Sequence, residues 1–120
     1  MIKTEERDGV LTNVVSADMT PDDVIAYVNE HVEEWQRREI CWILDDFDFS
    51  SINSTTVQTF IARLARRDSP RAGLKIALVV GDDFGFGMLR MLEMMAEGQI
   101  AMDINVLRTF EEAARWIKNG

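Results

Sequence analysis

The sequence has little of several residues that particular classes of protein need. Its 120 residues include one cysteine, Cys41, and one histidine, His31. One cysteine cannot form a disulfide within the chain, and it lies in the apolar run 40–44, where a buried small side chain is the ordinary interpretation. One histidine and one cysteine also argue against a zinc site. We therefore expect no bound metal and a reducing, cytoplasmic environment.

Long apolar runs and an excess of positive charge are missing as well. No apolar run approaches the roughly 18 residues of a membrane-spanning helix, and the first residues carry acids where a signal peptide needs an apolar segment. Acidic residues number 21 against 13 basic ones, a net charge of −8 that would repel a phosphate backbone. These features predict a cytoplasmic protein that is not an integral membrane protein and does not bind nucleic acid.

Residues that break regular structure are scarce too. The chain has two prolines and seven glycines, and 47% of its residues are hydrophobic, which leaves no room for long disordered tracts. Its length is close to the commonest domain size. We expect one domain over residues 1–120.

The apolar pattern predicts alternating strands and helices. In chain order these are a hairpin turning at Asp8-Gly9, a helix from Pro21 to about Arg37, a buried strand over 40–44, a helix capped by Asn53, a buried strand over 74–80, a helix ending at Gly98, a strand over 104–107 and a short last helix. This order implies an α/β fold: a mixed sheet of four to five strands, the later ones parallel, covered by about four helices.

The helix before Gly98 carries more apolar surface than one core-facing stripe needs. At 100° per residue Phe84, Met88, Met91, Leu92 and Met95 face the core, and Phe86 points away from it. Flexible methionines and exposed apolar patches are typical of binding surfaces. The alternative is that Phe86 folds back over Gly87 and packs. The predicted ligand- or partner-binding residues are Phe84, Gly85, Phe86, Gly87, Leu89, Arg90 and Met94.

Carboxylates follow the two most buried strands. They are Asp45, Asp46, Asp48, Asp82 and Asp83. One interpretation is a Mg²⁺ site at the carboxyl ends of parallel strands, in a phosphatase or phosphotransfer protein. The other is that these acids cap the following helices. We favour capping because no lysine or phosphate-cradling glycine loop accompanies them.

No catalytic constellation accompanies the single histidine. His31 lies on a helical face with Val28, Val32 and Trp35, which indicates a histidine at the rim of the core. No serine, cysteine or second histidine forms a nucleophile pattern with it. We therefore predict no catalytic residue and no cofactor.

Four motifs, taken in order, resemble one family. They are Thr20-Pro21-x-Asp23, the acidic strand end 44–49, the stretch 79–91, and the C-terminal pattern from Val106 to Ile117. Together they resemble the SpoIIAA-like proteins, which are related to STAS domains and, in structure, to the CRAL-TRIO lipid-carrier fold. The resemblance covers roughly the whole chain after Gly9.

This resemblance implies a mixed sheet with helices and a regulatory or binding role without catalysis. Residues Ile52-Asn53-Ser54-Thr55 are similar to the turn that is phosphorylated in STAS regulators, with Asn53 in place of an aspartate. Ser54 is therefore the candidate phosphorylation site. The expected partners are a protein, a second copy of the chain in a homodimer, or a small apolar ligand.

Overall fold

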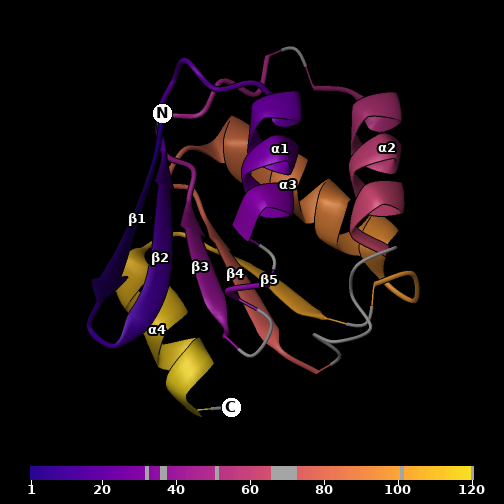
Figure 1. Cartoon of the computed structure of the whole chain (residues 1–120). Helices are drawn as coiled ribbons and strands as arrows, with labels where there is room; N and C mark the ends of the chain where they lie inside the picture. Colours follow the sequence, from indigo (N-terminus) through magenta and orange to yellow (C-terminus); the bar gives the residue numbers. More distant parts are fainter. Residues whose placement is uncertain (32, 36–37, 51, 66–72, 101, 120) are drawn as a thin grey trace.

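A computed structural model describes residues 1–31, 33–35, 38–50, 52–65, 73–100 and 102–119. These residues form five strands and four helices (Figure 1). In chain order they are β1 (Ile2–Arg7), β2 (Val10–Val15), α1 (Pro21–His31), β3 (Ile40–Ile43), α2 (Ser54–Ala65), β4 (Lys75–Val79), α3 (Asp83–Ala96), β5 (Asp103–Leu107) and α4 (Phe110–Asn119). The predicted α/β fold is confirmed.

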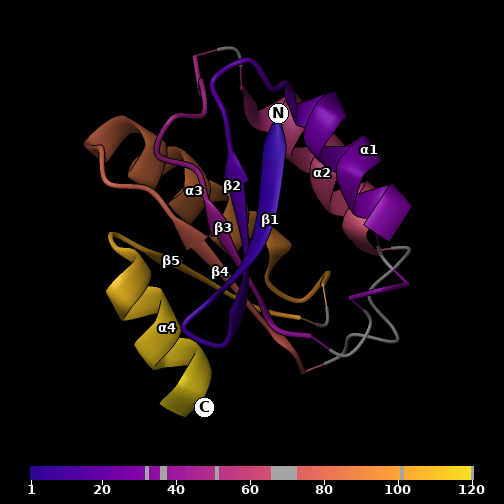
Figure 2. The same cartoon turned by 60° about the vertical axis from the view of Figure 1, so that its left-hand side comes forward.

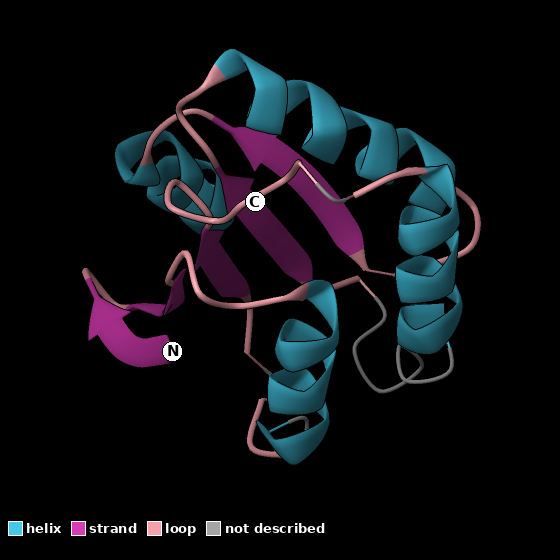
Figure 3. Ribbon diagram, turned by 90° about the horizontal axis from the view of Figure 1, so that it is seen from above, coloured by secondary structure: helices cyan, strands magenta, loops and turns pink. Residues whose placement is uncertain are grey.

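The strands lie side by side in the order in which they occur along the chain. β1 pairs with β2 in antiparallel fashion, and β2 to β5 are parallel neighbours. Right-handed crossovers that all step in the same direction put their helices on one face of a sheet. Accordingly α1 and α2 lie on the side of the sheet opposite to α4 (Figure 2), and the view from above shows strands with helices on both sides (Figure 3).

Short sequence signals fix the boundaries of these elements. The hairpin turns at Asp8 and Gly9, whose φ angles of 54° and 78° are those of the tight turn that matches the twist of paired strands. Helix α1 opens with a capping box, in which the Asp23 N–H donates to Thr20 Oγ1 and the Thr20 N–H donates to Asp23. Helix α3 ends before Gly98, whose φ is 80°.

Helix α1 is shorter than predicted. It ends at His31, and residues 33–35 form a turn in which the Trp35 N–H donates to the His31 carbonyl. The turn lets Trp35 meet Trp42 of β3 edge to face, with ring centroids 6.1 Å apart. Val32 and Arg37, which the prediction included, lie outside the described residues.

The two faces of the sheet bury side chains of different size. Toward α4 the strands present Cys41, Ile43, Ala77 and Val79, which pack with alanines of that helix. Toward α1, α2 and α3 they present larger groups, among them Trp42. Small residues let α4 lie close to the sheet, whereas the opposite face is filled by long and aromatic side chains. No helix within the described ranges is long and apolar enough to cross a membrane.

Candidate functional site

An apolar cavity of about 150 Å³ lies between the sheet and helices α1, α2 and α3. Its floor is the sheet face that carries the larger side chains. The strands and the residue after β3 contribute Ile40, Trp42, Leu44, Ile76, Leu78 and Ile104. Alternate residues of parallel strands share a face, so these side chains form one continuous surface.

The three helices on this face supply the walls of the cavity. They contribute Pro21, Val24 and Val28 from α1, Thr56, Val57 and Phe60 from α2, and Met88, Leu89 and Leu92 from α3. The connecting segments complete the lining with Trp35, Phe47, Phe49, Ile52 and Met102. Spacings of three and four residues in each helix bring these side chains to its inner face.

The chemistry of the lining selects apolar molecules. Among the described lining residues, Thr56 and the indole N–H groups of Trp35 and Trp42 are the only polar side-chain groups, and none is charged. An apolar cavity of similar size in another protein stays dry and binds benzene. A charged ligand buried here would lose its hydration without gaining a counter-ion.

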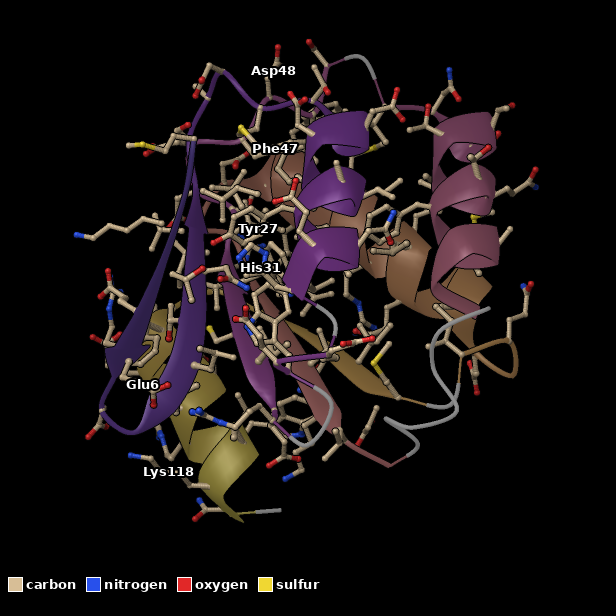
Figure 4. The ribbon with its side chains drawn as sticks, viewed as in Figure 1. Glu6, Tyr27, His31, Phe47, Asp48 and Lys118 are labelled. Atoms are coloured by element: carbon tan, nitrogen blue, oxygen red, sulfur yellow. The ribbon has the colours of Figure 1, made fainter. Side chains whose placement is uncertain are left out.

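Half-buried residues line the cavity on α1, α2 and α3 and in the connecting segments. Val28 on α1, Phe60 on α2 and Phe47 after β3 are half-buried lining residues, so they contact both the cavity and solvent. The two helices stand beside each other over the sheet (Figure 1). Figure 4 shows Phe47 in the segment at the end of the sheet near the start of α1.

The binding residues predicted on α3 divide between the two sides of the helix. Leu89 is buried and lines the cavity. Phe84 and Met94 are 60% and 68% exposed, on the other side of the helix. The remaining predicted residues are a buried Gly85, a half-buried Phe86, and an exposed Gly87 and Arg90.

The predicted orientation of the two phenylalanines in α3 is wrong. Phe84 was expected to face the core and is exposed, whereas Phe86 packs against the core cluster that includes Leu89. The guanidinium of Arg108 covers the Phe86 ring at 3.9 Å from its centroid. Because Arg108 also donates to the Gly81 carbonyl and to Asp83, it fixes that ring from outside.

The acidic side chains that follow the strands form hydrogen bonds, and in one case an ion pair, with neighbouring residues. Asp45 accepts from the Gly81 N–H at 2.7 Å, Asp82 caps α3 through the Gly85 N–H, and Asp83 pairs with Arg108. Asp48 accepts from Ser50, and hydrogen bonds from that serine lower its carboxyl pKa. Within the described residues no group of three or more acids, histidines or cysteines could hold a metal ion. Asp82 thus caps α3 as the capping interpretation predicts, whereas Asp45 and Asp48 accept hydrogen bonds from Gly81 and Ser50, which lie outside the helices.

Ser54 is exposed in the first turn of α2. The predicted cap is confirmed, because the Thr56 N–H donates to Asn53 Oδ1 at 3.0 Å. Val57, three residues after Ser54 and so on the same side of α2, lines the cavity. A group added to Ser54 would therefore stand beside one wall of the cavity.

Sequence reasoning missed most of this site. Trp42 and Leu44 were expected only as members of a buried strand, and Phe60 only as part of the helix that Asn53 caps. The feature of the sequence that could have indicated the cavity is the number of large side chains, since five aromatic residues line it: Trp35, Trp42, Phe47, Phe49 and Phe60. Large rigid side chains on one sheet face are harder to pack without a gap than small ones.

No family model matches this chain, and neither a curated protein nor a solved structure matches it.

Proposed function

We propose that this protein is a non-catalytic binding module that holds a small apolar ligand in the cavity between its sheet and α1, α2 and α3. The observation that carries the proposal is a cavity of about 150 Å³ with no charged group among its described lining residues. Its lining comes from three helices and three strands, so an occupant would contact most of the fold. Binding would stabilise the folded state by mass action.

The regulatory role is part of the same proposal. Support comes from the ordered motifs that resemble the SpoIIAA-like proteins and from the α/β sheet with its parallel later strands. The exposed Ser54 stands near the cavity wall formed by α2. We propose that the protein is cytoplasmic and that a phosphate at Ser54 would change the surface beside the part of the cavity wall that α2 forms.

Calorimetry with an apolar probe tests the proposal. α-Methylstyrene at 100 times its dissociation constant should raise the free energy of unfolding by about 2.7 kcal/mol, and the thermal midpoint should rise with it. Val28→Phe puts a larger side chain into the cavity and should weaken binding by about tenfold or more, because the ring occupies the ligand's space.

The matched control is Ala26→Phe, which adds a ring to the exposed side of the same helix. It should bind the probe as the unaltered protein does. The proposal is wrong if the probe leaves the thermal midpoint unchanged, or if Val28→Phe binds it with unaltered affinity.

A further inference from the structure

Aromatic and methionine side chains make up a large part of the cavity lining. They are Trp35, Trp42, Phe47, Phe49, Phe60, Met88 and Met102. Rings and thioethers make favourable contacts with an aromatic molecule that they do not make with an aliphatic molecule of the same size. The lining therefore bears on which kind of apolar molecule the cavity binds.

Four of these rings form two pairs that meet edge to face. The ring centroids of Trp35 and Trp42 lie 6.1 Å apart with planes at 82°, and those of Phe47 and Phe49 lie 5.0 Å apart with planes at 74°. A flat ring that lies parallel to one member of such a pair is edge-on to the other. Offset-stacked and edge-to-face contacts are the two arrangements that aromatic rings prefer, so a planar ligand beside either pair makes both.

A row of stacked rings from α1 holds Trp35 in its orientation. His31 stacks on Trp35 with centroids 5.2 Å apart and planes at 16°, and Tyr27 stacks on His31 at 4.2 Å and 28°. His31 Nδ1 also lies 2.9 Å from the Tyr27 carbonyl oxygen. Figure 4 shows Tyr27 and His31 next to each other at this helix. A wall whose rings are already ordered loses little conformational entropy when a ligand binds.

The volume of the cavity limits the size of its ligand. It is about 150 Å³, as in a cavity of another protein that binds benzene. Pockets for drug-sized molecules are larger, about 300–1,000 Å³. A single ring with a small substituent therefore fits, whereas a long acyl chain is too large.

From this lining and this volume we infer that the ligand is a small aromatic molecule with one ring, rather than an aliphatic hydrocarbon or a lipid chain. The inference rests on the proposed function and adds to it the chemical class of the ligand. Each contact between the ligand ring and a lining ring should strengthen binding by about two- to tenfold beyond the effect of the buried area.

Toluene and methylcyclohexane test the inference, because they share a carbon skeleton and differ in whether the ring is aromatic. Calorimetry measures both affinities, and division by the water-to-hexadecane partition coefficient of each molecule removes the difference in hydrophobicity. The corrected affinity of toluene should be about tenfold higher, since a planar ligand beside one pair makes two ring contacts. 1-Decanol, a long chain without a charge, should leave the thermal midpoint unchanged.

Replacement of one lining ring by an aliphatic side chain should reduce this preference. Phe47→Leu should lower the ratio of the two corrected affinities by about threefold, because it removes one ring from a pair. The matched control is Phe110→Leu, since Phe110 is also half-buried but packs on the opposite face of the sheet. It should leave the ratio unchanged.

A second measurement needs no variant. Ring-proton resonances of the tryptophan pair or of the phenylalanine pair should shift when toluene binds, because the ring current of the ligand acts on nearby protons. They should shift much less with methylcyclohexane. Trp116 of α4 packs on the other face of the sheet and is the control within the same spectrum. Its resonances should stay in place with both probes.

The outcomes separate the inference from the proposed function. If the two probes bind with equal corrected affinities, or if toluene shifts the resonances of neither pair, the cavity still binds apolar molecules but the inference is wrong. It is also wrong if 1-decanol binds more tightly than toluene, or if Phe47→Leu keeps the full preference. If toluene, methylcyclohexane and α-methylstyrene all leave the thermal midpoint unchanged, both the proposed function and the inference are wrong.

Discussion

Two glycines in α3 have opposite surroundings although they are two residues apart. A Cβ at Gly85 would lie 2.7 Å from Val80 Cγ2 and 2.9 Å from Phe49 Cε2, and both of those residues are buried. A Cβ at Gly87 would have nothing within 4 Å. Glycine is therefore needed at the first position for the close approach of α3 to the strand end, and it only weakens the helix at the second.

We predict opposite effects of alanine at these positions. Gly85→Ala should lower the free energy of unfolding by about 1–2 kcal/mol, because overpacking outweighs the gain in helix propensity. Gly87→Ala should raise it by up to about 1 kcal/mol. Denaturant midpoints measure both, and equal effects of the two changes would contradict the close packing at Gly85.

At the scale of the element, α3 shows how a helical pattern can misplace residues at one end of a helix. Met88, Met91, Leu92 and Met95 pack against core clusters as predicted, whereas Phe84 is exposed. The helix has apolar residues around much of its circumference, so its periodicity alone does not choose an inner side. The structure buries Gly85, Leu89 and Ala96, a stripe that includes two of the smallest side chains. Close packing against the strands, rather than the largest apolar groups, decides which face turns inward.

Substitution of the two phenylalanines tests this assignment. Phe86→Ser should lower the free energy of unfolding by about 2 kcal/mol, because the ring packs on the core under Arg108. Phe84→Ser, at a ring that is 60% exposed, should change it by less than about 0.5 kcal/mol. Denaturant unfolding at several protein concentrations provides the measurement. A larger loss for Phe84→Ser, or a loss that depends on concentration, would place Phe84 in an interface.

On the scale of the whole molecule, the sheet separates a tightly packed face from one with a cavity. Cys41 lies on the tightly packed face, between Thr12 of β2 and Ala77 of β4, and all three residues are 0% exposed. Burial raises the pKa of its thiol to about 12. Reagents that need a thiolate can reach it only when the sheet opens.

We predict that the Cys41 thiol reports unfolding of the whole domain. At pH 8 a disulfide reagent should react with native protein no faster than the domain unfolds, and at once with protein in urea. The folded state keeps the proton that the unfolded thiol loses near pH 9, so stability should fall as pH rises from about 9 toward 12. Rapid reaction of the native protein at pH 8, with no dependence on urea, would show that the face toward α4 opens locally.

Local signals in the sequence determined the order and ends of most elements. The turn at Asp8-Gly9, the caps at Thr20, Asn53 and Asp82, and the end of α3 before Gly98 each depend on residues a few positions apart. The two buried strands were recognisable because strands covered on both faces have continuous apolar sequences. From these elements the α/β class and the parallel later strands follow by the handedness of the crossovers.

The tertiary structure decided the binding site. A cavity is a difference between the space enclosed by several elements and the volume of the side chains that fill it, and no local pattern contains that difference. In the sequence, Trp42 and Val28 look like ordinary core residues. Only the packing of three helices over this face leaves space beside Trp35 and Trp42.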